Sequence, residues 1–197
     1  MCILAAALPT LSFGLCCGAF LLVLGVIFVF YLVTIYNSLI QLRNNIDKAW
    51  ANIDVLLKQR SDLIPNLVST VKGYMVHESQ VLEKVTKLRA SLMSYQSPAK
   101  KASSSEQISE GLKSIFVVAE KYPKLQANEN FLKLQEQLSL IENQIADRRE
   151  FYNNSVLFFN TRIKSIPAVF VATVLGMKNK EYFKISQEDA KTPEVKV

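Results

Sequence analysis

Residues 11–35 read LSFGLCCGAFLLVLGVIFVFYLVTI, and this stretch decides the fold of the 197-residue chain. It contains no charged side chain. At a rise of about 1.5 Å per residue, a helix of this length exceeds the roughly 30 Å hydrocarbon core of a bilayer. Tyr31 and Tyr36 lie near its C-terminal end, where interfacial aromatic residues are expected. The stretch therefore predicts a transmembrane helix over 11–35, preceded by a short N-terminal tail over 1–10.

The distribution of charge favours a retained anchor over a cleaved signal peptide. A signal peptide has a basic head, a shorter apolar core and a polar stretch after its cleavage site. In this chain no charged residue precedes Arg43, and the apolar run is longer. Arg43, Lys48, Lys58 and Arg60 follow the predicted helix. The positive-inside rule then predicts a single-pass protein of the cell membrane whose following domain lies in the cytoplasm.

The three cysteines, Cys2, Cys16 and Cys17, all lie in the uncharged N-terminal part. The charged remainder therefore has no thiol for a disulfide framework or a zinc site. The adjacent Cys16 and Cys17 allow two interpretations, a lipid-modified or oxidised pair and a pair of small apolar residues in a membrane helix. The second interpretation is favoured.

After the anchor, apolar side chains recur at alternating steps of three and four residues, which is typical of a helix with one packed face. Pro65 interrupts this first helix because its ring removes one backbone hydrogen bond. Two interpretations remain open: a kinked helix that turns near Gly73 to His77, and a turn at Ser61 to Pro65 with Ser61 as N-cap. The first seam consists of Leu39, Leu42, Ile46, Ala49, Ile53, Leu56, Leu63, Leu67, Thr70 and Tyr74, with Arg60 in one of its positions.

The rest of the chain predicts three more helices. A flexible connection, SPAKKASSSE at 97–106, separates the second from the third. The third ends at Tyr122, because a residue before proline avoids the helical conformation. The fold class is all-α: an N-terminal transmembrane helix followed by an antiparallel four-helix bundle of long, kinked helices over 36–165. The fourth helix has the seam Phe131, Leu134, Leu138, Ile141, Ile145, Tyr152, Ser155 and Phe159, with Arg148 in one of its positions.

Arg60 and Arg148 occupy seam positions that apolar residues would ordinarily fill. They could form an anion site or a polar layer inside the bundle. Alternatively, each could reach solvent or pair with a nearby carboxylate such as Asp62, Asp147 or Glu150. The alternative is favoured, because arginine is rarely buried completely.

Four stretches after the anchor carry a family resemblance. They read YNSLIQLRNNIDKAWANIDVLLKQRSDLIPNLVSTVKGYMVHE (36–78), LEKVTKLRA (82–90), AEKYPKLQANENFLKLQEQL (119–138) and IENQIADRREFYNNSV (141–156). These stretches are similar to the LemA family of bacterial membrane proteins. The resemblance implies an N-terminal membrane helix, a four-helix bundle and no established enzymatic activity. Some relatives in magnetosome-forming bacteria are associated with the shaping of internal membranes.

The charged part offers no arrangement typical of an enzyme. Its single histidine, His77, is followed by Val81 where a zinc peptidase motif needs a second histidine. There is no glycine-rich phosphate loop. The net charge of +6 is spread over interspersed signs rather than a basic stripe. We therefore expect no enzymatic activity, no cofactor, no metal and no nucleic acid partner.

A second apolar stretch, SIPAVFVATVLGM at 165–177, is too short to span a bilayer and is followed by lysines. The sequence predicts an apolar then basic segment over 166–184 and a disordered tail over 185–197. The segment could lie at the membrane interface or fold back over the bundle core, and the pattern does not decide between these. The interfacial hypothesis assigns lipid contacts to Ile166, Val169, Phe170, Lys178 and Lys180.

These features predict a membrane-anchored helical scaffold or adaptor that is not catalytic and presents a bundle surface to a protein partner. The alternative is a membrane-shaping oligomer that acts on the lipid bilayer through the C-terminal segment. The expected partners are the bilayer and an unidentified membrane or membrane-associated protein, or further copies of the chain in a homo-oligomer. The predicted interaction residues are Tyr36, Asn37, Asp62, Pro65, Asn66, Tyr152 and Asn153.

Overall fold

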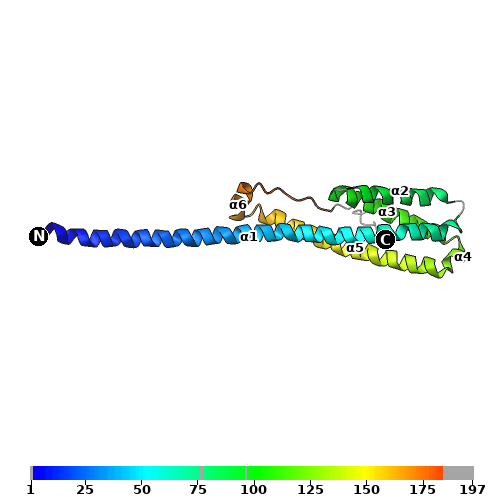
Figure 1. The fold of residues 1–197 in the computed structure, drawn as a ribbon, viewed down its shortest axis with the longest axis horizontal. Helices are drawn as coiled ribbons and strands as arrows, with labels where there is room; N and C mark the ends of the chain where they lie inside the picture. Colours follow the sequence, from blue (N-terminus) through cyan, green and yellow to red (C-terminus); the bar gives the residue numbers. More distant parts are fainter. Residues whose placement is uncertain (1, 76–77, 96, 184–197) are drawn as a thin grey trace, which may run out of the picture. The chain divides into compact units, whose positions relative to one another are not determined.

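A computed structural model describes residues 2–75, 78–95 and 97–183, with side chains from residue 20 onward. These described residues form helices and no strand, which confirms the all-α prediction for this part of the chain (Figure 1). His77 and the tail over 185–197 lie outside the described residues. The helices are α1 (Cys2–Lys72), α2 (Ser79–Ser94), α3 (Pro98–Ala119), α4 (Pro123–Gln126), α5 (Glu129–Arg162) and α6 (Ala168–Val174).

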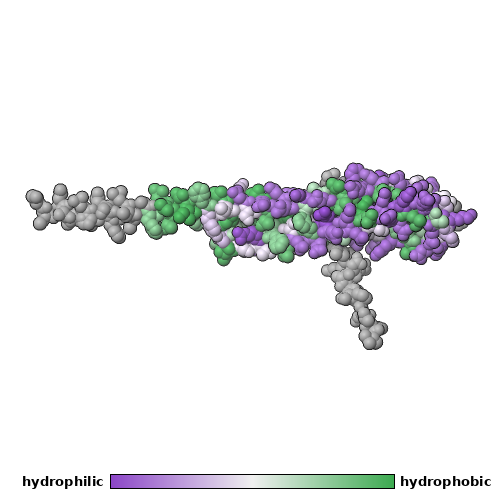
Figure 2. All heavy atoms as spheres, turned by 90° about the horizontal axis from the view of Figure 1, so that it is seen from below, coloured by the Kyte–Doolittle hydropathy of each residue, from purple (hydrophilic) through white to green (hydrophobic). Residues whose placement is uncertain are grey.

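The N-terminal part of α1 is long and apolar enough to cross a membrane. Among the described residues one helical segment, Phe20–Lys72, meets this condition, and its most apolar 18-residue window has a mean hydropathy of 2.3 with 6% of the window buried. A core helix of a soluble protein would instead be mostly covered. The large side chains of Phe20, Leu22 and Phe30 are exposed. Figure 2 shows hydrophobic residues gathered on the surface of the N-terminal part of α1. The predicted single membrane span therefore lies within α1.

The chain divides into two compact units. One consists of Met1–Asn44 and Phe159–Asn179 and is called the anchor unit below. The other consists of Asn45–Phe158 and Lys180–Val197 and is called the helical domain. Both α1 and α5 contribute residues to each unit.

The predicted seam of α1 contributes to the core of the helical domain. Ile53 and Leu67 are completely buried, as the alternation of three and four residues predicts. Val71, beside the seam, is also completely buried, whereas the seam residue Tyr74 is exposed. The helix continues through Pro65 and ends at Lys72, so the predicted turn near Gly73 is confirmed and the alternative turn at Ser61 to Pro65 is wrong. Burial of the apolar face on both sides of Pro65 outweighs the one hydrogen bond that proline removes.

The start of α3 corrects one prediction. The stretch 97–106, predicted to be a flexible connection, is helical from Pro98 onward. Pro98 occupies the first turn, where its missing N–H has no helical partner to lose. Ala102, Ser104 and Ser105 are buried, so their small side chains let neighbouring helices approach closely. Tertiary packing therefore makes a helix of a serine-rich stretch that local propensity assigns to a loop.

Helices α2 and α3 pack directly against each other. A Cβ atom on Gly111 would lie 2.6 Å from Cγ2 of Val85, so only glycine fits this contact without a shift. The chain then turns where the sequence predicts, since α3 ends at Ala119 and α4 begins at Pro123. The next helix, α5, is capped by Asn128, whose Oδ1 accepts a hydrogen bond from the Phe131 N–H at 3.1 Å.

Candidate functional site

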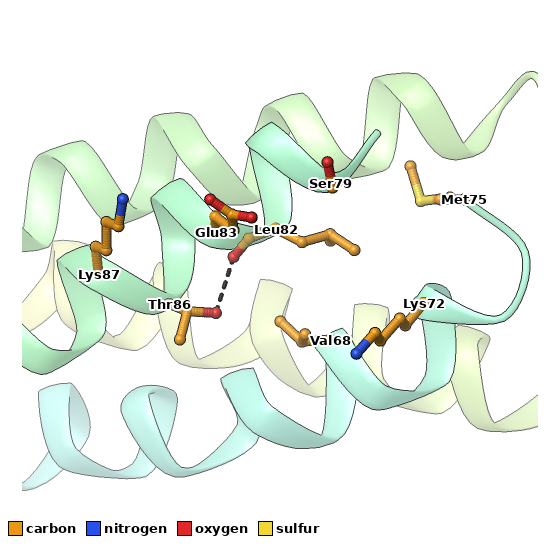
Figure 3. A pocket seen from close by; sticks show the side chains of 8 residues that line it. All are labelled: Val68, Lys72, Met75, Ser79, Leu82, Glu83, Thr86 and Lys87. Carbon is orange, nitrogen blue, oxygen red and sulfur yellow. Dashed lines mark hydrogen bonds between the residues drawn. The ribbon is translucent and has the colours of Figure 1, made fainter. Parts of the chain in front are cut away.

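A groove lies between the end of α1 and the start of α2, with a cavity volume of about 430 Å³ (Figure 3). Val68 and Lys72 come from the last turns of α1, and Leu82 projects into the space from α2. Its floor is apolar and largely buried, since Met75 and Leu82 are almost fully covered. The volume falls in the range of sites that take a small ligand or the side chains of a docked peptide.

The rim of the groove is polar and exposed. Two lysines, Lys72 and Lys87, stand on it against one glutamate, Glu83. The hydroxyl of Thr86 donates to the Leu82 carbonyl at 2.8 Å, the dashed line in Figure 3, and so is engaged within α2. The groove can therefore hold an apolar group on its floor while its rim favours a negatively charged one.

A buried polar layer joins α1, α3 and α5. Arg60 of α1 is completely buried. Its guanidinium donates to the Ser105 carbonyl at 3.0 Å, to Ser105 Oγ at 2.6 Å and to Ser109 Oγ at 2.8 Å. It also forms an ion pair with Glu142 of α5, and the Ser109 hydroxyl donates to the same carboxylate at 2.9 Å. Three helices thus converge on one charged side chain.

The environment of Arg60 corrects another prediction. Its partner is Glu142, 82 residues away in the sequence, and not the neighbouring Asp62. Burial lowers the pKa of Arg60 from its ordinary value, and the negative charge of Glu142 opposes this effect. Arginine stays protonated despite such a shift, so the layer holds a charge at neutral pH. Arg148, by contrast, is exposed, as the favoured interpretation predicted.

Pro65 creates a second polar contact between helices. Proline has no N–H, so it cannot donate to the carbonyl of Ser61, four residues earlier. Ser61 is completely buried, and its carbonyl accepts a hydrogen bond from Arg89 Nε of α2 at 2.7 Å. An arginine therefore supplies the donor that the helix lacks. Of the predicted residues near this point, Asp62, Pro65 and Asn66 are exposed on α1, and Asp62 pairs with Lys58 at 3.1 Å.

The last described residues are clasped by α5. The Phe183 N–H donates to Asn153 Oδ1 at 2.8 Å, and Asn153 Nδ2 donates to the Phe183 carbonyl at 3.2 Å. The Tyr152 hydroxyl donates to the Glu181 carbonyl at 3.1 Å. Two side chains of α5 thus replace the backbone partners that an extended segment would have in a sheet.

Aromatic contacts complete this clasp. The buried ring of Phe183 lies 6.1 Å from the ring of Trp50 and 4.6 Å from the Arg149 guanidinium carbon, at cation–π distance. Trp50 also packs edge-on against Tyr152 at 5.8 Å. Burial raises the pKa of Tyr152, and the charges of Asp47 and Glu181 add to this rise. Tyr152 and Asn153, predicted as interaction residues, are thus engaged within the chain.

The other predicted contact residues belong to the anchor unit, apart from Lys180. Tyr36 and Asn37 are exposed on α1. Ile166, Phe170 and Lys178 are exposed, and Val169 is half-buried. Lys180, in the helical domain, is half-buried.

The described residues contain no group of three or more histidine, cysteine, aspartate or glutamate side chains that could hold a metal ion. What sequence reasoning missed are the partners distant in sequence: Glu142 and Ser105 for Arg60, Arg89 for Ser61, and Trp50 for Phe183. Only the position of Arg60 in a mostly apolar seam signalled that a partner was needed.

The sequence model of the LemA family matches residues 49–197. The chain is 28% identical to Protein LemA of Metamycoplasma hominis over 172 residues, which cover 85% of this chain and 77% of that protein. It is also 23% identical to Magnetosome protein MamQ 2 of Paramagnetospirillum magneticum and 21% identical to Magnetosome protein MamQ of Magnetospirillum gryphiswaldense. Each of these two matches covers 80% of this chain and 68% of the relative.

None of these relatives carries the name of an enzyme. The family match covers most of the chain and agrees with the single apolar helix and the all-helical fold of the described residues. The chain is therefore a single-pass membrane protein that belongs to the LemA family.

Proposed function

We propose that this protein is a membrane-anchored, non-catalytic scaffold or adaptor that presents its helical domain to a protein partner. The observation that carries the proposal is the groove between α1 and α2, with its apolar floor of Val68, Met75 and Leu82 and its charged rim. A groove of this kind suits an amphipathic helix, which places apolar side chains on the floor. The excess of lysine on the rim favours acidic residues on that helix.

The domain that carries the groove would be an antiparallel four-helix bundle of α1, α2, α3 and α5. The contacts of Arg60 with α3 and α5 and of Arg89 with α1 support this arrangement. Such a bundle gives the groove a rigid frame, because buried polar contacts fix the register of the helices. We place this domain in the cytoplasm, since Arg43 and Lys48 follow the membrane span and no basic residue precedes it.

Anchoring makes a weak interface sufficient. A partner in the same membrane meets the groove at a raised effective concentration, so binding becomes efficient without a large contact area. An acidic, amphipathic segment of another membrane protein therefore fits both the groove and the location.

The test is crosslinking of the full-length chain in intact cells, followed by identification of the recovered proteins. The groove variant is Lys72→Glu with Lys87→Glu, which reverses two exposed charges on the rim. The matched control is Lys124→Glu with Lys133→Glu, which reverses two exposed lysines elsewhere in the helical domain. We expect one reproducible partner to be recovered with the native chain and the control, and to be lost with the groove variant.

A different outcome would favour the alternative, a membrane-shaping oligomer. In that case crosslinking would recover only the chain itself, in ladders of multiples. The purified protein would also self-associate and deform liposomes without any partner. Recovery of a partner that both variants retain would reject the groove as the docking site while leaving the adaptor role in place.

A further inference from the structure

We propose that α6 and the turn before it form a second membrane contact, which inserts Ile166, Phe170 and Val174 into the interface of an anionic bilayer beside the membrane-spanning helix. Together with the exposed Lys164 and Lys178, these three residues are called the interfacial foot. This contact is independent of the adaptor role.

The exposure pattern of α6 gives the first argument. Ala168 and Ala172 are 0% and 3% exposed, so one side of this short helix is packed. Ile166, Phe170 and Val174 are 80%, 67% and 87% exposed. Phe170 and Val174 are four residues apart and lie on one face of α6, and Ile166 lies in the turn just before this helix. Three large, exposed apolar side chains on and just before a packed element mark a contact surface rather than scattered surface residues.

The residues that share a unit with α6 indicate where this surface lies relative to the membrane. The anchor unit that contains α6 also contains Ile35 and Leu39, which are buried at the end of the predicted span. Tyr31 and Tyr36 are exposed on the same part of α1, where tyrosines mark the boundary between lipid and water. The foot therefore lies in the same compact unit as the predicted boundary between lipid and water.

Charge and local geometry agree with an anionic bilayer as the occupant. Lys164 precedes α6 in the sequence, Lys178 follows it, and both are exposed. Arg43 is exposed on α1 in the same unit. Cations in these positions attract acidic headgroups while the apolar face lies among the acyl chains. Gly176 then ends the helix with a positive φ of 61°.

The hydrogen bonds of this helix end are specific. The Gly176 N–H donates to the Thr173 carbonyl at 3.0 Å, and the Met177 N–H donates to the Ala172 carbonyl at 3.0 Å. This pair of bonds is a Schellman motif, which satisfies carbonyls that would otherwise be costly to bury near lipid. The foot is therefore a short element whose helix end has its backbone hydrogen bonds made and whose apolar side chains are exposed.

The experiment uses the full-length chain in vesicles of phosphatidylcholine and phosphatidylglycerol that contain brominated acyl chains. The chain has a single tryptophan, Trp50, so the difference between the emission of a variant and that of the native chain reports the surroundings of the added tryptophan. Phe170→Trp probes the foot. Val117→Trp is the matched control, because Val117 is 61% exposed on α3 of the helical domain. We expect brominated lipid to quench the tryptophan of Phe170→Trp, with its emission shifted to the blue, and to leave that of Val117→Trp unaffected.

Equal quenching of the two variants would overturn the proposal. So would a tryptophan at 170 that is shielded from acrylamide but not quenched by brominated lipid, because a protein would then cover the face. The lysines are tested by adding Lys164→Gln and Lys178→Gln to Phe170→Trp. This change should remove any gain in quenching that phosphatidylglycerol gives over phosphatidylcholine alone. An unchanged gain would reject the anionic preference. Crosslinking tests the adaptor role, and quenching by brominated lipid tests the membrane contact. A failure to recover a partner by crosslinking would therefore leave the expected quenching unchanged.

Discussion

Pro65 removes one backbone hydrogen bond from α1, and Arg89 of α2 replaces it. The proline thereby turns a local defect into a contact between two helices, since the free carbonyl of Ser61 is buried and needs a donor. Pro65 is itself exposed, and the Ser61 carbonyl that it leaves free is bonded across to α2.

A double-mutant cycle tests this replacement. Arg89→Ala in the native background should lower the free energy of unfolding by about 1–3 kcal/mol, because it leaves a buried acceptor without a partner. In the Pro65→Ala background the new N–H can donate to Ser61, so the loss should fall below about 1 kcal/mol. Denaturant unfolding of the full-length chain, followed by circular dichroism, measures both. Lys84→Ala, at an exposed position of α2, is the control and should be near neutral. Equal losses in the two backgrounds would contradict the replacement.

At the scale of elements, Arg60 determines how α1, α3 and α5 meet. An apolar residue in its place could pack against several alternative registers, whereas the guanidinium needs Ser105, Ser109 and Glu142 together. Charged groups in a core limit the arrangements that bury them with partners. The serine-rich start of α3 is therefore part of the core.

Glu142→Gln should destabilise the helical domain. The glutamine keeps the shape but removes the charge that opposes buried Arg60. The Glu142 side chain is 38% exposed, so solvent reduces the effect below that of a fully buried pair, to about 2 kcal/mol. Glu136→Gln, at an exposed position of α5, is the control and should change stability by less than about 0.5 kcal/mol. Thermal unfolding of the two variants compares them directly, and similar midpoints would show that the ion pair contributes little.

At the scale of the whole molecule, the clasp at Asn153 returns the chain that follows α6 to the helical domain. It joins Trp50, Tyr152 and Phe183, which are far apart in the sequence. The backbone bonds of Glu181 and Phe183 depend on side chains of α5 and on no regular secondary structure. The attachment of residues 181–183 to the rest of the helical domain therefore depends on a few side chains.

Tyr152 makes the attachment of residues 181–183 to α5 sensitive to alkaline pH. Its pKa is raised in the folded state by burial first and by Asp47 and Glu181 second, so folding favours the neutral phenol. The stability that the residue contributes is intact below the unfolded value of about 10 and is lost as the pH rises through the higher folded value. Tyr152→Phe should cost about 1 kcal/mol at neutral pH, through the lost hydrogen bond to Glu181. Urea unfolding at increasing pH should show the native chain and the variant converging above pH of about 10. Parallel curves would contradict this dependence.

The sequence alone determined the features that depend on local pattern. An uncharged run longer than a bilayer predicts the span at 11–35, and steps of three and four residues predict the buried face of α1 through Ile53 and Leu67. The LemA resemblance needed only the order of residues. These properties follow from hydrophobicity and helical periodicity, which neighbours in sequence express.

Only the tertiary structure decided the pairing of polar groups. Ser97 to Glu106 looks like a loop until Arg60 is seen bonded to Ser105, because serine favours loops unless a distant donor uses its oxygen. Arg89 is hydrogen-bonded to Ser61, 28 positions away in the sequence, and Asn153 is hydrogen-bonded to Phe183, 30 positions away. Hydrogen bonds need atoms within about 3 Å at defined angles, and the distance between atoms of remote residues exists only once the helices have packed.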